Sequence, residues 1–187
     1  MWNNLDDLNK KILIDSDVIR HFIRGRQIDI LKKIFTDNLY ILSTVEKEIS
    51  RSKKIKPEVI RIINNGTLKR MRFPTNPKFM LEYAELIKRF GEGESACMAV
   101  ARYDDDIIAS NNLNDIKEYC NLYKISYLTT IDILFVAYKR GIMNEADVDY
   151  FLYFNITGAN PSKIPFPTLA EFISTKPAIC DLYRNAV

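Results

Sequence analysis

The stretch Lys11-Ile12-Leu13-Ile14-Asp15 decides the fold class, because its unbroken apolar run is typical of a strand that is buried on both faces. Residues 18 to 30 then show a helical spacing of apolar side chains, with a break at Gly25. A buried strand that leads directly into a helix is the first half of a βαβ unit. The opening of the chain therefore predicts a parallel sheet covered by helices.

The alternation of strand and helix continues along the chain. Short β-branched runs predict further strands at 39–43, 107–110 and 125–128. Helical patterns are found at 44–50, from Pro57 onward, and at 78–90, 94–103, 130–139, 145–154 and 169–173. We therefore expect an α/β fold with three layers, α/β/α, in which a central parallel sheet of four to five strands lies between helices.

The length of 187 residues favours a single core. Residues 1–143 hold the strand and helix alternation, and residues 144–187 form a helical and loop extension that we expect to pack on the same domain. The first ten residues lack the pattern of a secretory signal, and no apolar stretch approaches the roughly 18 residues that cross a bilayer. We expect a cytoplasmic protein with no membrane partner.

The sequence favours carboxylates over thiols or imidazoles as reactive groups. Cys97, Cys120 and Cys180 lack the CxxC spacing of a zinc or redox site. His21 is the single histidine, which argues against a Ser-His-Asp or Cys-His arrangement. Any acid–base chemistry is therefore expected to depend on aspartate and glutamate.

A basic stretch runs from Arg51 to Arg72. It holds eight lysines and arginines against one acid, a net charge of +7, while the remaining residues sum to −4. Such a stretch favours a polyanionic partner such as a nucleic acid, with Lys53, Lys54, Arg70 and Arg72 as candidate phosphate contacts. A solvated helix face is an equally good interpretation of the same charges.

Several acidic and polar side chains follow the predicted strands. Asp15 ends the first strand, Glu46 comes shortly after the second, and Ser110 ends the third. Ligand sites in open parallel sheets form beyond the carboxyl ends of the strands. We therefore expect these residues to converge on one edge of the sheet.

These segments together resemble the PIN-domain family, and within it the VapC-like toxins and their relatives. The stretch Ile12 to Ile19 is similar to the family's opening strand and first acid, and Ser43 to Ile49 to its second element. Gly91-Glu92-Gly93-Glu94, followed by an alanine-rich helix, is similar to an acidic segment of one branch. Ser110 to Ile116 resembles the polar motif after a later strand. The resemblance spans roughly residues 11 to 142.

The resemblance implies a Rossmann-like PIN fold and an endoribonuclease that uses Mg²⁺ or Mn²⁺ to hydrolyse single-stranded RNA, leaving 5′-phosphate and 3′-hydroxyl ends. It assigns metal binding and catalysis to four acids, with two supporting polar residues: Asp15, Glu46, Glu94 and Asp115, with Ser110 and Asn112. Toxin relatives also imply a homodimer and an antitoxin protein as partners. Oxygen ligands alone favour hard cations, in agreement with these metals.

The sequence leaves alternatives open at each acidic position. Asp15 could merely cap the helix that follows it, as could Asp17. Glu48 could replace Glu46 as the ligand, and Glu92 could replace Glu94, since both pairs lie near helix starts.

The asparagines before Asp115 leave the function open as well. Asn111 and Asn112 stand where some PIN branches carry an aspartate pair, so the metal site could be weakened. One alternative is therefore a nucleic-acid-binding or interaction protein that no longer cuts. The other is a structure-specific DNA nuclease, which shares the metal chemistry and differs in substrate.

Overall fold

The sheet at the centre of the molecule has five parallel strands. The computed structural model describes residues 10–157 and 161–176. Within them the strands are β1 (Ile12–Ile14), β2 (Leu39–Leu42), β3 (Lys69–Met71), β4 (Ile107–Ala109) and β5 (Tyr127–Leu128), in the spatial order β3-β2-β1-β4-β5. Every neighbouring pair is parallel. The predicted α/β class with a central parallel sheet is confirmed.

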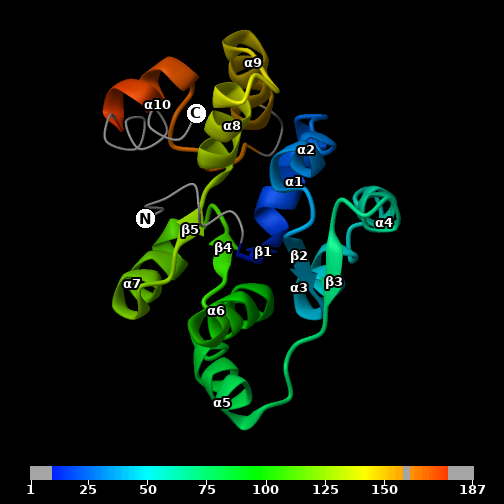
Figure 1. The fold of residues 1–187 in the computed structure, drawn as a ribbon, viewed down its shortest axis with the longest axis vertical. Helices are drawn as coiled ribbons and strands as arrows, with labels where there is room; N and C mark the ends of the chain where they lie inside the picture. Colours follow the sequence, from blue (N-terminus) through cyan, green and yellow to red (C-terminus); the bar gives the residue numbers. More distant parts are fainter. Residues whose placement is uncertain (1–9, 158–160, 177–187) are drawn as a thin grey trace.

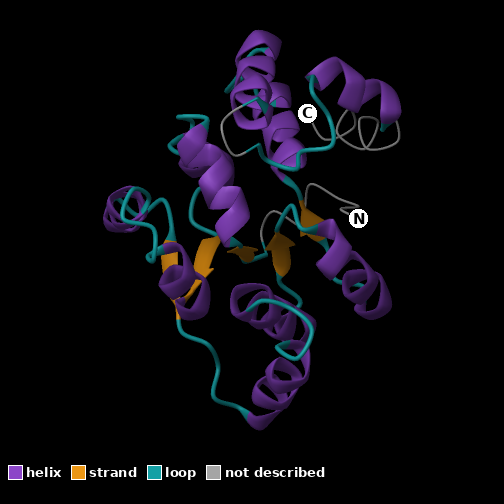
Figure 2. Cartoon of the chain, turned by 180° about the vertical axis from the view of Figure 1, so that it is seen from behind, coloured by secondary structure: helices purple, strands orange, loops and turns teal. Residues whose placement is uncertain are grey.

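Helices cover both faces of this sheet. They are α1 (Ser16–Arg24), α2 (Ile30–Phe35), α3 (Ser43–Ile49), α4 (Lys56–Asn64), α5 (Pro77–Leu86), α6 (Glu92–Asp104), α7 (Leu113–Tyr123), α8 (Thr130–Lys139), α9 (Glu145–Ile156) and α10 (Leu169–Thr175). One layer contains α1, α2, α8, α9 and α10, and the other contains α3, α5, α6 and α7 (Figures 1 and 2). No helix in the described parts of the chain is both long and apolar enough to span a membrane.

Three elements lie wholly or mostly where the sequence predicted none. The edge strand β3 has the sequence Lys-Arg-Met and is only partly buried, so it lacks the apolar run of a central strand. Only Ile116 and Cys120 are buried in α7, which leaves a weak helical pattern. The third, α2, begins at the last residue of the expected helix 18–30 and extends to Phe35, and the expected helix is interrupted because Gly25 ends α1 with its N–H bonded to the His21 carbonyl.

The helix α9 packs directly against α1. The rings of Phe22 and Phe151 lie 5.1 Å apart, and the amide of Asn155 donates to the carbonyl of His21 at 3.2 Å. At Gly25 a Cβ atom would come within 2.3 Å of the Phe151 ring, so the two helices approach closely only because this residue is glycine.

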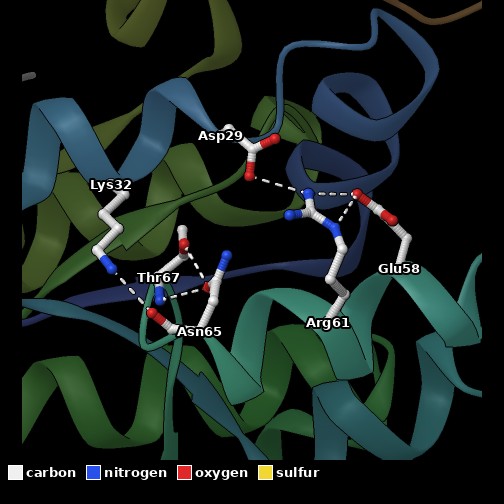
Figure 3. A network of polar contacts seen from close by, with 6 residues as sticks. All are labelled: Asp29, Lys32, Glu58, Arg61, Asn65 and Thr67. Carbon is white, nitrogen blue, oxygen red and sulfur yellow. Dashed lines mark hydrogen bonds and ion pairs between the residues drawn. The ribbon is translucent and has the colours of Figure 1, made fainter.

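A network of polar contacts ties α4 to α2 and the turn before it (Figure 3). The guanidinium of Arg61 donates to Glu58 and to Asp29, the latter at 2.9 Å. Lys32 on α2 donates to the carbonyl of Asn65 at 2.8 Å. Arg61 belongs to the basic stretch, but its charge is paired with two acids of the protein itself.

Candidate functional site at the carboxyl edge of the sheet

Asp15 is a buried carboxylate at the end of the central strand. Its backbone N–H donates to the carbonyl of Ala109 on β4. This hydrogen bond holds the end of β1 against β4. One carboxylate oxygen accepts from the N–H of Ser16 at 2.7 Å, and the other accepts from the Ser110 hydroxyl at 3.3 Å. Asp15 is thus the N-cap of α1, as the alternative interpretation expected, and it also faces other acids.

The surroundings of Asp15 disfavour its charged form. Burial raises the pKa of the Asp15 carboxyl well above its usual value, and the neighbouring charges of Asp17, Glu94 and Glu48 raise it further. Burial raises the pKa of the Cys97 thiol, and the negative charges of the same four acids raise it further: Asp15, Glu94, Asp17 and Glu48. The four acids therefore form one electrostatic cluster.

Asp17 belongs to this cluster, although the sequence offered it only as a possible helix cap. Its carboxylate accepts from the backbone N–H of Asn111 at 2.8 Å and from that of Val18 at 2.5 Å. Burial raises the pKa of Asp17 to about 6, and these hydrogen bonds limit the rise. In the sequence, the only indication that Asp17 belongs to the site is its position two residues after Asp15, the acid that ends the strand.

Glu48, and not Glu46, stands beside Asp15. One oxygen of Glu48 accepts from the Ser16 hydroxyl at 2.6 Å. A Cβ atom at Gly93 would lie 2.9 Å from the other oxygen of Glu48 and 3.5 Å from an oxygen of Asp15. The two carboxylates therefore flank the same glycine, which leaves room for both.

Glu46 points to a different partner. Its carboxylate forms a two-pronged ion pair with Arg70 on β3, with N–O distances of 2.8 to 3.0 Å. The geometry thus favours the alternative that the sequence left open, with Glu48 in the place expected for Glu46. Arg70, a candidate phosphate contact, is engaged by the same pair.

Glu94 lies at the first turn of α6 and couples the cluster to Asp115. Burial and the charge of Asp115 raise the pKa of Glu94 to about 7. Its Oε1 atom is buried and accepts no hydrogen bond within the described structure. Asp115 accepts from the side-chain amide of Asn112 at 2.7 Å. Glu92, the rival of Glu94, is exposed to solvent.

The residues Ser110, Asn111 and Asn112 hold the acids in place. The Ser110 hydroxyl contacts Asp15 and accepts from the N–H of Asn112 at 3.2 Å. The side-chain oxygen of Asn111 accepts from the N–H of Thr130 at 2.7 Å, at the start of α8. Asn111 therefore links Asp17 to α8, a positioning role that the sequence did not suggest.

The carboxylates do not form a ready-made metal site as they lie. Across residues 10–157 and 161–176, no three His, Cys, Asp or Glu side chains are arranged to hold a metal ion. The donor chemistry nevertheless fits a hard cation, since every ligand would be a carboxylate oxygen. A cation bound here would give the unpartnered Oε1 of Glu94 a partner and would reduce the mutual repulsion of the acids.

Three of the four basic candidates are exposed residues next to α3 or β3. Lys53 and Lys54 occupy the segment that follows α3, the helix of Glu48, and Arg72 directly follows β3. All three side chains belong to exposed residues, so they are accessible to a polyanion.

The chain matches no protein-family model, and no curated protein is significantly similar to it.

Proposed function

We propose that this protein is a metal-dependent endoribonuclease of the PIN type. The observation that carries the proposal is the cluster of Asp15, Asp17, Glu48 and Glu94, which come from three segments of the chain and repel one another at the carboxyl edge of the sheet. Burial and neighbouring charges raise the pKa values of Asp15, Asp17 and Glu94, and acids perturbed in this way are common at catalytic sites. The resemblance to PIN domains in the order of the strand-end motifs supports the same activity.

The acids divide into ligands and a proton acceptor. Asp15 and Glu48, which flank Gly93, would hold Mg²⁺ or Mn²⁺, with Asp17 and Asp115 as further oxygen donors. Such an ion, when bound, offsets the charge that develops on the scissile phosphate. Glu94 has a pKa of about 7 and a buried unpartnered oxygen, so it suits a general base that takes a proton from the attacking water. The P–O3′ bond then breaks, and solvent supplies the proton for the 3′ oxygen.

The exposed basic residues favour an RNA substrate. Lys53, Lys54 and Arg72 offer cations beside the helix that carries Glu48, and phosphate contacts of this kind give salt-sensitive binding. Arg70 contributes less, because Glu46 neutralises it.

The decisive experiment uses paired variants with purified protein, single-stranded RNA and Mn²⁺. Asp15→Asn and Glu48→Gln should each lower the cleavage rate by about 10² or more, the size of effect that loss of a transition-state contact produces. Glu46→Gln is the matched control on the same helix and should cut at close to the wild-type rate. Full cleavage in EDTA, or in Asp15→Asn, would overturn the proposal. A parallel assay on branched DNA distinguishes an RNase from a structure-specific DNA nuclease.

A binding function without cleavage is the second candidate. It is favoured by the absence of a three-ligand arrangement in the described residues and by Asn111 and Asn112 near the acids. It predicts salt-sensitive RNA binding with no metal-dependent turnover. Turnover that is lost in Asp15→Asn excludes it.

The proposed toxin role extends to partners and location. A PIN-type toxin would act in the cytoplasm, pair as a homodimer and bind an antitoxin. A neighbouring gene for a small DNA-binding protein that co-purifies with this chain would support that role. Isolation of a chain that cuts RNA without such a partner would leave the nuclease proposal intact and remove the toxin role.

A further inference from the structure

A cavity of about 450 Å³ opens at the amino edge of the sheet, where the strands begin. Its walls come from the residue before β1, the start of β2, the end of α2 and the end of α8: Lys11, Asn38, Tyr40, Thr36 and Arg140 among them. Its volume falls in the range of roughly 300–1,000 Å³ that is typical of small-molecule sites. The acids of the carboxyl edge do not contribute to it.

Two cations line this cavity. The ammonium of Lys11 forms ion pairs with Asp106 at 3.7 Å and with Asp104 at 3.9 Å, and neither acid lines the cavity. Both distances are long for a hydrogen bond, so the three N–H donors of Lys11 can also reach a ligand. The guanidinium of Arg140 is oriented by a 2.7 Å hydrogen bond to the carbonyl of Ile34. Arginine has five N–H donors, so others remain for an anion.

The polar groups that would repel an anion are already engaged. Asp37, the only acid among the lining residues, is 79% exposed and pairs with Lys69 at 3.3 Å. At the end of α2, the carbonyls of Lys32 and Phe35 accept backbone hydrogen bonds, and that of Ile34 accepts from Arg140. The described lining therefore holds two cations, Lys11 and Arg140, against one acid, and the ion pairs of Lys11 with Asp104 and Asp106 offset part of its charge.

Tyr40 adds an aromatic surface. Its ring is partly buried at β2 and lines the cavity. The ammonium of Lys69 lies 5.9 Å from the ring centroid, so a cation already borders the ring. Aromatic rings of this kind stack readily on nucleic-acid bases.

We propose that this cavity binds a free mononucleotide, with the phosphate group paired to Lys11 and Arg140 and the base packed on Tyr40. The site is distinct from the acidic cluster, because Lys11 and Asp15 bracket β1 and lie about 13 Å apart along an extended strand. The proposal therefore stands independently of nuclease activity.

The test is calorimetric titration of the full chain with 5′-AMP in EDTA, with adenosine and inorganic phosphate as part-ligands. AMP should bind at least about tenfold more tightly than either part. Lys11→Met should weaken AMP binding about tenfold, whereas Lys33→Met, an exposed lysine of α2 outside the cavity lining, should leave it unchanged.

A second variant distinguishes a specific loss of AMP binding from a loss caused by unfolding. Asp37→Asn removes the acid from the cavity wall and should tighten AMP binding about two- to threefold, which a damaged fold cannot do. Asp15→Asn, at the other edge, should bind AMP as the wild type does. The proposal is overturned if AMP does not bind at millimolar concentration, if Lys11→Met binds it normally, or if only Asp15→Asn changes the affinity.

Discussion

Glu94 carries a charge that the folded protein accommodates poorly. Its pKa of about 7 lies well above the usual 4.5, because the side chain is partly buried and faces Asp115. A carboxyl whose pKa is raised on folding contributes stability below its unfolded pKa, near 4.5, and this contribution is lost as the pH rises through about 7. In the metal-free protein, Glu94 should therefore destabilise the folded state at neutral and alkaline pH.

The variant Glu94→Gln tests this penalty directly. In EDTA it should be more stable than the wild type at pH 8, by about 1–2 kcal/mol after allowance for solvent screening, and equal to it at pH 4.5. Denaturant unfolding at the two pH values gives the difference. Glu92→Gln alters an exposed glutamate in the same helix turn and should show no such pH dependence. A Glu94→Gln protein that is less stable at pH 8 contradicts the assignment.

The choice between Glu46 and Glu48 shows what the sequence could not decide. The buried stripe of α3 runs through Val45 and Ile49. At 100° per residue, Glu46 and Glu48 lie about 80° to either side of that stripe, so the helical pattern treats them alike. Only the packing of α3 on α6, where Gly93 admits a carboxylate, places Glu48 with Asp15. Asp15 itself could be predicted, because the end of a central strand is a position that the sequence marks.

At the scale of elements, the close packing of α1 and α9 depends on one glycine. Gly25→Ala would set a Cβ atom 2.3 to 2.4 Å from two carbons of the Phe151 ring, which is fully buried. We expect a loss of about 1–3 kcal/mol, since overpacking a tight interface forces neighbouring groups to move. Thermal and denaturant unfolding measure it.

A second substitution and a control test whether a clash between the methyl group added by Gly25→Ala and Phe151 causes the loss of stability. Phe151→Leu in the Gly25→Ala background removes part of the ring and should cost less than the sum of the two single changes. Gly91→Ala creates no such clash, because its Cβ would meet only one atom within 4 Å, at 3.9 Å, so it should cost at most about 1 kcal/mol, the effect of alanine at the N-cap of α6. Strictly additive losses at Gly25 and Phe151 would refute a clash between them.

Elements that follow a strong apolar pattern could be predicted, and those at the margins could not. The strand β1 and the helix α8 were expected at nearly their observed positions, because their buried residues leave a clear pattern. The strand β3 was missed because its stability comes from pairing with β2, which no local pattern records. The helix α7 was missed because one narrow stripe of it reaches the core.

At the scale of the whole molecule, the segment 144–187 contributes to the core. Phe151, Leu152 and Val148 on α9 are fully buried. Burial of one large apolar side chain contributes about 1.5–3 kcal/mol, and domains are stable by only about 5–15 kcal/mol. A chain truncated after Met143 should therefore show no cooperative unfolding transition by calorimetry.

Substitutions on the outer face of the same helix provide the control for the truncation. Tyr150→Ser and Tyr153→Ser remove side chains that are more than half exposed, so the melting temperature should change little. A truncated chain that melts cooperatively near the wild-type temperature would show that residues 1–143 fold alone.

The position of β1 in the sheet has a consequence for synthesis of the chain. This strand is synthesised before the other four strands of the sheet, yet it lies in the middle of the finished sheet, between β2 and β4. Its partner on one side, β4, is translated about 95 residues later. Until then one edge of an entirely apolar strand stays open to other nascent chains, and such edges promote aggregation. A pause in translation between β1 and β4 would prolong that exposure, so the pace of the ribosome over this interval should influence how much protein reaches the native state.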